Sequence, residues 1–175
     1  GLGRGEETGA LVRALVRDCP CPLVADADAL WALSGDLTAL REARAAVLTP
    51  HAREFALLGG DPDGDRRKEA AAFAREYGCC LVLKGHETVA AFPDGEIYVN
   101  HTGNPGMAKG GTGDVLTGLI GALLCQLPLR RAVKTAVWLH GRAGDRCAEE
   151  LGEYGMTASD LVRALPLAMK EITEA

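Results

Sequence analysis

The chain has 175 residues, of which 47% are hydrophobic and 25% are charged, a balance that is ordinary for a single globular domain with a buried core. The formal net charge is −5 and the basic residues are scattered in short groups, so the sequence speaks against a nucleic-acid partner. No apolar run reaches the roughly 18 residues that a transmembrane helix needs, and we therefore expect no membrane association.

Helical and strand patterns alternate along residues 1–100. Apolar strands are expected within residues 22–30, which run into the acidic Asp26 and Asp28, and within 45–50 and 79–85. The segments 87–92 and 96–100 flank a Pro-Asp-Gly turn and predict a β-hairpin. The helices expected here cover residues 6–17, a short segment near Trp31, residues 53–58, and residues 65–78 with Gly78 as the C-cap.

Three further helices are expected after the hairpin, at roughly residues 114–126, 129–151 and 158–173. Thr157 followed by Asp160 resembles a capping box at the start of the last one. Apolar strands separated by helices predict an α/β protein, with a mostly parallel sheet covered on both faces and the hairpin at one edge. We expect residues 1–175 to form a single domain.

The six cysteines contain no C-x-x-C pair: they occur as Cys-Pro-Cys, Cys-Cys and two single residues. Most lie in or beside apolar runs, where a thiol behaves as a small hydrophobic group. The pattern predicts a reduced, cytoplasmic protein and does not favour metal or redox chemistry.

Polar residues stand where the expected strands end, which is where open α/β sheets bind their ligands. These residues are Asp26 and Asp28, Thr49 to His51 with Glu54, Lys84 with Gly85, and Asn100. A lysine at a strand end suits an anion contact, although a lysine that merely extends its ammonium into solvent remains the alternative. His51 and Glu54 lack the spacing of a helical zinc pair and no third ligand is suggested, so we expect no metal site on the protein.

A glycine-rich loop, residues 103–113, precedes a long apolar segment. It matches neither the Walker nor the dinucleotide pattern, because Ala108 and Leu116 stand where those patterns need glycine. Gly-Gly-Thr-Gly-Asp at a helix start instead predicts backbone N–H groups that converge on a phosphate. Asp114 then lies beside the phosphate; it either complements the helix dipole or takes a proton from a substrate hydroxyl, and we favour the base.

Four strings, "GNPGMAKGGTGDVLTG", "LTPHAREF", "LVLKGHET" and "VADADAL", together resemble the ADP/ATP-dependent NAD(P)H-hydrate dehydratases of the ribokinase-like superfamily. The resemblance implies a three-layer α/β/α fold. It also implies repair of hydrated NADH or NADPH: ADP or ATP with Mg²⁺ phosphorylates the ring hydroxyl, and elimination of phosphate restores the dihydronicotinamide.

The resemblance also implies roles for individual residues. Asp114 would be the base, and Gly3, His51 and Glu54 would line the substrate site with it. The residues implied in nucleotide binding are Lys84, Gly85, His86, Glu87, Thr88, Asn104, Pro105, Gly106, Met107, Ala108, Lys109, Gly110, Gly111, Thr112 and Gly113.

Two departures from the family pattern affect these expectations. Arg53 stands where the family commonly has glycine, and of the family's Gly-Pro-Gly-Leu-Gly motif only the last three residues are present. We therefore expect a chain that lacks the family's N-terminal strands, self-associates through the exposed sheet and can be inactive alone. The alternatives are a ribokinase-like kinase for a vitamin-precursor alcohol and an inactive nucleotide-binding fragment.

Overall fold

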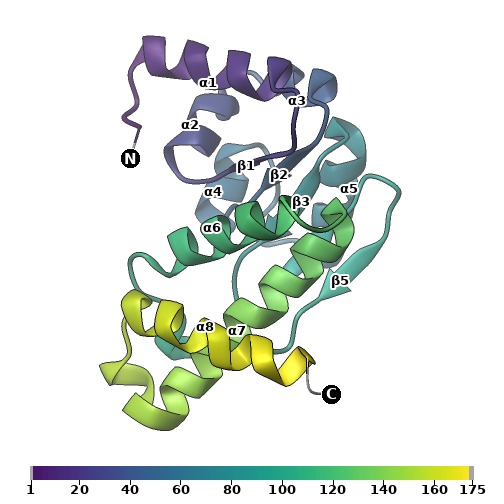
Figure 1. The fold of residues 1–175 in the computed structure, drawn as a ribbon. Helices are drawn as coiled ribbons and strands as arrows, with labels where there is room; N and C mark the ends of the chain where they lie inside the picture. Colours follow the sequence, from purple (N-terminus) through teal and green to yellow (C-terminus); the bar gives the residue numbers. More distant parts are fainter. Residues whose placement is uncertain (1, 174–175) are drawn as a thin grey trace. The chain divides into compact units, whose positions relative to one another are not determined.

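The computed structural model describes residues 2–173, and the chain divides after Val99 into two compact units. The first unit contains a five-stranded sheet in the order β1-β2-β3-β4-β5 (Figure 1). Its strands are β1 (Leu23–Ala25), β2 (Ala46–Leu48), β3 (Cys80–Leu83), β4 (Val89–Ala91) and β5 (Ile97–Val99).

The sheet is parallel in one half and antiparallel in the other, as the sequence predicts. β1, β2 and β3 run parallel, with Val24 opposite Val47 and Leu48 opposite Leu81. β4 and β5 form the expected hairpin, in which β4 pairs antiparallel with β3 on one side and with β5 on the other. All four residues of β3 are buried, which is typical of a strand covered on both faces.

Five helices accompany the sheet in this unit: α1 (Glu6–Asp18), α2 (Asp28–Ser34), α3 (Thr38–Glu42), α4 (Ala52–Leu57) and α5 (Arg66–Tyr77). Local chemistry sets the bounds of α5, because the Asp65 carboxylate accepts hydrogen bonds from the N–H groups of Arg67 and Lys68, and Gly78 adopts φ 64° at the C-cap. Phe55 and Phe73 meet edge to face in the core. The five-residue α3 was not expected from the sequence.

The second unit contains one 3₁₀ turn and three α-helices: η1 (Pro105–Met107), α6 (Thr112–Leu124), α7 (Leu129–Gly155) and α8 (Ala158–Thr173). α7 packs against η1, α6 and α8. α6 begins two residues earlier than expected, and α7 is longer than expected but is interrupted at Gly152, whose φ is 71°. No helix within residues 2–173 is long and apolar enough to cross a membrane. That residues 1–175 form one domain stays a prediction.

Candidate functional site

The glycine loop, residues 103–113, is attached at its beginning to the middle of α7. The Asp145 carboxylate accepts a hydrogen bond from the backbone N–H of Gly103 at 3.0 Å and another from the side-chain amide of Asn104 at 3.1 Å. The Asn104 side-chain oxygen in turn accepts the N–H of Gly106 at 3.1 Å and thereby caps η1. Asn104 and Asp145 therefore fix the position of the first residues of the loop on α7.

The next part of the loop packs too closely on α7 to accommodate larger residues. A Cβ atom on Gly106 would lie 2.6 Å from the Met156 sulfur and 2.7 Å from the Glu153 carbonyl oxygen. On the helix side, a Cβ on Gly144 would lie 2.2 Å from the Met107 sulfur. The packing of Met107 and Gly106 explains part of the glycine and methionine pattern without any ligand.

Lys109 uses its ammonium group to close the C-terminal end of α7. Its Nζ donates hydrogen bonds to three backbone carbonyl oxygens: Glu153 at 2.9 Å, Tyr154 at 2.9 Å and Met156 at 2.7 Å. An ammonium has three N–H donors, so all three are engaged. This contact combines favourable charge at a helix C-terminus with satisfaction of its last carbonyls. The side chain is thus a structural tie between the loop and α7.

The last part of the loop presents backbone N–H groups that have no acceptor within residues 2–173: those of Gly110, Gly111, Gly113 and Asp114. Gly111, the N-cap of α6, adopts φ 91° and offers no side chain to cap the helix. Gly110 is exposed, and a Cβ there would meet open space. The row of amides at the positive end of a 13-residue helix has the chemistry of an anion site.

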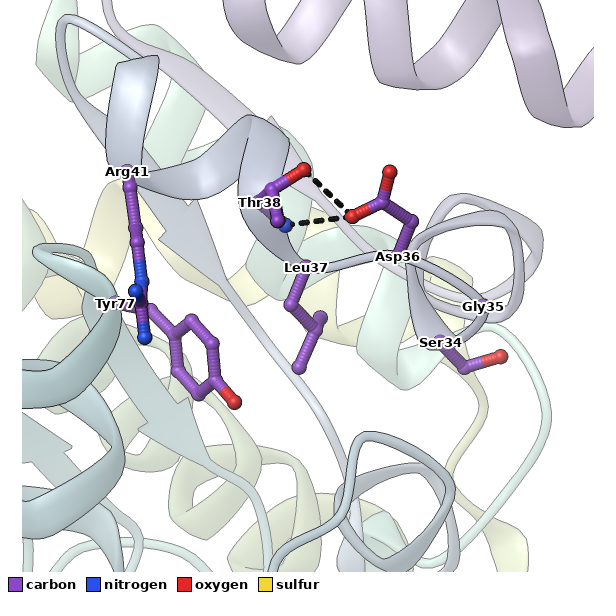
Figure 2. Close-up of a pocket in the computed structure, with 7 residues that line it drawn as sticks. All are labelled: Ser34, Gly35, Asp36, Leu37, Thr38, Arg41 and Tyr77. Atoms are coloured by element: carbon purple, nitrogen blue, oxygen red, sulfur yellow. Dashed lines mark hydrogen bonds between the residues drawn. The ribbon is translucent and has the colours of Figure 1, made fainter.

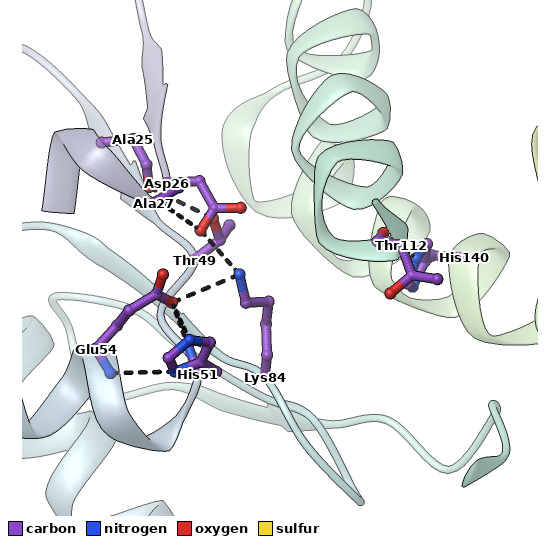
Figure 3. Close-up of polar contacts among 9 residues, drawn as sticks. All are labelled: Ala25, Asp26, Ala27, Thr49, His51, Glu54, Lys84, Thr112 and His140. Carbon is purple, nitrogen blue, oxygen red and sulfur yellow. Dashed lines mark hydrogen bonds and ion pairs between the residues drawn. The ribbon is translucent and has the colours of Figure 1, made fainter. Parts of the chain in front are cut away.

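Thr112 and His140 hold the first turn of α6 in place (Figure 3). His140 Nε2 donates a hydrogen bond to the Thr112 carbonyl oxygen at 2.8 Å. The Thr112 hydroxyl lies 2.8 Å from the Met107 carbonyl oxygen and 2.9 Å from that of Lys109. The side chain of Thr112 is therefore directed into the loop, and it is buried.

Asp114 lies in the first turn of α6 with its side chain exposed. Its carboxylate forms no hydrogen bond or ion pair within the described part of the chain, so the geometry leaves it accessible to a ligand. The helix dipole favours a carboxylate at this position by about 0.3–1 kcal/mol. The position therefore suits both roles that the sequence left open for Asp114.

In the first unit, three strand-end residues meet at the carboxyl ends of β1, β2 and β3. Lys84 Nζ donates a hydrogen bond to Asp26 Oδ1 at 2.8 Å and lies 3.7 Å from Glu54 Oε2 (Figure 3). All three side chains are no more than about one-fifth exposed, so their charges are partly shielded from water. The predicted convergence of polar groups at the strand ends is confirmed for these residues.

His51 and Glu54 cap α4 reciprocally. The backbone N–H of Glu54 donates to His51 Nδ1 at 3.1 Å, and the backbone N–H of His51 donates to Glu54 Oε2 at 2.8 Å. This is a capping box in which histidine replaces the usual serine or threonine. Arg53 lies in the helix with an exposed side chain, so the backbone here does not require the glycine that the family commonly has.

The Lys84–Thr88 segment turns sharply after β3. Gly85 adopts φ 148° and Glu87 φ 51°, and the Thr88 hydroxyl donates to the Gly85 carbonyl oxygen at 3.0 Å. Arg66 supports the turn, since its Nη2 donates to the carbonyl oxygens of Leu83 and Lys84 at 3.0 and 3.3 Å. Burial lowers the pKa of the Arg66 guanidinium. His86 is exposed on the same turn.

Gly3 lies near the N-terminus of α2. Its N–H donates to Asp28 Oδ2 at 3.0 Å, and Arg4 Nε donates to Asp28 Oδ1 at 3.2 Å. The Gly3 N–H, followed by the Arg4 guanidinium, holds the pKa of the Asp28 carboxyl below its ordinary value. The neighbouring Ala27 adopts φ 51°, an uncommon conformation for a residue with a Cβ atom.

A shallow hollow in the first unit is separate from these residues (Figure 2). None of the residues that the sequence nominated for a site lines it, and Arg41 lies over the Tyr77 ring at 5.4 Å from the ring centroid. The lining residues are Ser34, Gly35, Asp36, Leu37, Thr38, Arg41 and Tyr77. Its position gives no support to a role in the chemistry expected of this chain.

Comparison with known proteins settles the family. The profile of the NAD(P)H-hydrate dehydratases matches residues 1–167. The chain belongs to this family. It is 45% identical to a bifunctional NAD(P)H-hydrate repair enzyme of Moorella thermoacetica over 99% of this chain and 34% of that protein. It is 40% identical to an ADP-dependent (S)-NAD(P)H-hydrate dehydratase of Neisseria meningitidis over 99% of this chain and 62% of that enzyme.

Solved structures of dehydratase-family and ribokinase-like proteins share the fold. The Bacillus subtilis ADP/ATP-dependent NAD(P)H-hydrate dehydratase, co-crystallised with ATP and Mg²⁺, superposes with a TM-score of 0.85 at 34% identity, over 98% of this chain and 62% of that one. A ribokinase-like superfamily protein of Enterococcus faecalis gives 0.84 at 30% identity, over 98% and 61%. The chain thus spans between about a third and three fifths of the length of the relatives it matches here.

Three supporting residues were missed in the sequence: Arg66, His140 and Asp145. Each acts through a backbone group far away along the chain, and only the tertiary fold reveals such a contact. His140 and Asp145 do share the string "WLHGRAGD" on α7. Its two glycines mark a helix face that other groups approach closely: Thr102 at Gly141 and the Met107 side chain at Gly144. That string was the available signal.

Proposed function

We propose that this chain carries out, or forms the greater part of the site for, the nucleotide-dependent dehydration of hydrated NADH or NADPH. Its family and the names of its relatives support the proposal. The observation that carries it is local: the open backbone N–H groups of the glycine loop adjoin the exposed Asp114 carboxylate, which gives an anion site beside a candidate base.

The terminal phosphates of ADP or ATP bind the open N–H groups of Gly110, Gly111, Gly113 and Asp114 in this proposal. Such donors stabilise charge on a phosphoryl group as it is transferred, and they need no reorganisation because the helix holds them. Asn104 to Met107 and Thr112 contribute by holding the loop. Lys109 stabilises the loop through its hydrogen bonds to the end of α7. Because its ammonium donors are already engaged there, its positive charge acts on the phosphates only at a distance.

Asp114 takes the proton of the ring hydroxyl as that oxygen attacks the terminal phosphorus of the nucleotide. The bond from this phosphorus to the bridging oxygen breaks, and the shortened nucleotide leaves. The carbon–oxygen bond of the new phosphate ester then breaks. Phosphate leaves with the electron pair of that bond, while the ring nitrogen donates its lone pair to the ring. Loss of a proton from the adjacent carbon restores the dihydronicotinamide. In these steps the chain itself positions the two reactants, removes the proton of the ring hydroxyl and stabilises the charge on the phosphate.

Mg²⁺ would supply charge neutralisation for the phosphates. We propose that phosphate oxygens and water would hold most of it, because Mg²⁺ keeps several of its waters and usually binds through substrate phosphates. One carboxylate near the phosphates is enough for such a loosely held ion.

The residues at the strand ends of the first unit bind the hydrated nicotinamide nucleotide in this proposal. Lys84 holds a positive charge between Asp26 and Glu54, and a substrate phosphate or hydroxyl can exchange for one of these partners. His51 presents an exposed ring edge on the same helix start. Gly3 stays a candidate for a contact with the substrate. The backbone that follows Lys84, from Gly85 to Thr88, stays a candidate for contacts with the nucleotide. Homo-oligomer formation and a cytoplasmic location also stay predictions.

The decisive experiment follows the absorbance of the reduced nicotinamide ring after hydrated NADPH, Mg²⁺ and either ADP or ATP are added. We expect reduced cofactor to reappear, and Asp114→Asn to lower the turnover by about 10²–10⁴-fold with nucleotide affinity retained. Asp63→Asn is the matched control, because it makes the same chemical change in an exposed loop of the first unit and should leave turnover unchanged.

The outcomes separate the candidate functions. Turnover of Asp114→Asn within about threefold of the parent would show that Asp114 is not the base. Nucleotide binding without any recovery of reduced cofactor would favour the nucleotide-binding fragment. Phosphorylation of a vitamin-precursor alcohol without dehydration would favour the kinase.

A further inference from the structure

Two thiols lie next to each other where α1 ends and β1 begins. Cys19 Sγ and Cys21 Sγ are 3.4 Å apart, Cys21 is exposed and Cys19 is partly exposed. No disulfide joins the cysteines of residues 2–173. We propose that Cys19 and Cys21 form a reversible dithiol–disulfide site that reacts with low-molecular-weight disulfides, in contrast to the reduced thiols expected from the sequence.

The local backbone holds the two sulfurs close together. Cys19 is the C-cap of α1, and its N–H donates to the Leu15 carbonyl oxygen at 3.0 Å. Pro20 has a fixed φ and so limits the motion of the segment between the thiols. Arg44 Nη1 donates to the Pro20 carbonyl oxygen at 2.7 Å and anchors the same segment from the side of β2. The sulfurs need to approach by about 1.4 Å, from 3.4 Å to the 2.05 Å of a disulfide bond.

The other four cysteines lack this combination of access and a thiol partner. Cys79 and Cys80 are adjacent in sequence but are only 1% and 2% exposed, and burial raises the pKa of Cys79 to about 12. Burial likewise raises the pKa of Cys147. Cys125 is exposed, but its sulfur contacts the Gly121 carbonyl oxygen instead of a thiol. Since the thiolate is the nucleophile, the buried thiols should be inert.

The reaction is thiol–disulfide exchange in two steps. The Cys21 thiolate attacks one sulfur of the oxidant, whose S–S bond breaks, giving a mixed disulfide on Cys21 and one released thiolate that takes up a proton. The Cys19 thiolate then attacks the Cys21 sulfur and releases the second half of the oxidant. The protein loses two electrons and two protons, and the oxidant becomes two thiols. Because the bond closes a ring of only three residues, it constrains the unfolded chain little and acts as a modification and not as a staple.

The test uses the full chain, fully reduced and then equilibrated with excess oxidised glutathione. Alkylation, tryptic cleavage after Arg17 and Arg41, and mass spectrometry then report on the peptide 18–41, whose two cysteines are Cys19 and Cys21. We expect this peptide to be lighter than the unalkylated reduced form by two hydrogen atoms and to regain both alkylation sites after reduction. Cys125 is the internal control, since it should carry glutathione and form no internal bond.

Single variants test the assignment of the two thiols. Cys19→Ser should accumulate a stable glutathione adduct on Cys21, and Cys21→Ser should form its adduct on Cys19 at least about threefold more slowly, because Cys19 is less exposed. The proposal would be overturned if peptide 18–41 kept two alkylatable thiols while Cys125 was glutathionylated. It would also be overturned if both Cys19 and Cys21 carried glutathione without an internal bond.

Discussion

Replacing Lys109 with methionine tests whether this lysine supports the fold of the glycine loop or contacts the nucleotide. Methionine keeps much of the apolar stem but removes the ammonium that donates to three carbonyl oxygens at the end of α7. If Lys109 is a structural tie, stability should fall while nucleotide affinity changes little. If it binds phosphate, the reverse should hold.

The expected magnitude follows from the geometry. A hydrogen bond from a charged donor contributes about 1.5–3 kcal/mol when both groups are shielded from water. Lys109, Glu153 and Tyr154 are exposed, however, so water replaces much of what the ammonium supplies. We therefore expect a loss of about 1–3 kcal/mol in the free energy of unfolding for the three bonds together. For a chain of this size that corresponds to a fall in Tm of about 2–12 °C.

The assay combines guanidinium unfolding of the free protein with calorimetric titration of ATP. Lys68→Met is the matched control, because Lys68 is 83% exposed on α5 and its nearest carboxylate oxygen, on Asp65, is 3.9 Å away. The control should stay within about 0.5 kcal/mol of the parent. If Lys109→Met unfolded like the control and its Kd for ATP rose more than about tenfold, the ammonium would be a phosphate ligand and our interpretation of the loop would be refuted.

Two other sites in the second unit give predictions of known sign. Gly141→Ala should destabilise by about 1–3 kcal/mol in thermal unfolding, because the new Cβ would lie 2.6 Å from the Thr102 backbone. Gly118→Ala is the control: its Cβ meets open space on α6, so it should stabilise by up to about 1 kcal/mol. Equal changes in Tm for the two variants would contradict the packing argument. Thr157→Ala should cost about 1 kcal/mol at neutral pH by removing the cap of α8. Hydrogen bonds from Thr157 hold the pKa of Asp160 below its ordinary value, so this contribution is present above about pH 4 and is lost as the pH falls through the lower folded value. A penalty independent of pH between about 2 and 7 would exclude Asp160 from the cap.

Elements with a local signal were predicted well from the sequence. The Pro-Asp-Gly turn predicted the β4–β5 hairpin, and Thr157 with Asp160 predicted the capping box, whose two backbone hydrogen bonds measure 2.9 and 3.4 Å. Gly78 was placed correctly at the C-cap of α5. In each case the residues that fix the geometry are within a few positions of one another, so the local sequence pattern is enough to predict the structure.

Elements whose cause lies elsewhere in the fold were missed. α3 has only five residues, too few to display helical periodicity. Anion binding by the glycine loop stays a prediction, and the dependence of the loop's shape on α7, through Asp145 and Lys109, was not foreseen. His51 and Glu54 were expected near the substrate, and their mutual capping of α4 was unforeseen because histidine is an unusual N-cap.

The uncapped first turn of α6 has a consequence for the behaviour of the protein in solution. Gly111 supplies no side chain to cap this helix, and the N–H groups of Gly110, Gly111, Gly113 and Asp114 have no acceptor in the described chain. These four amide hydrogens should therefore exchange quickly in ligand-free protein and slowly once an anion is bound. An anion that binds only the ordered first turn of α6 stabilises that turn relative to its unfolded form. The order of the turn should therefore increase with the concentration of the anion.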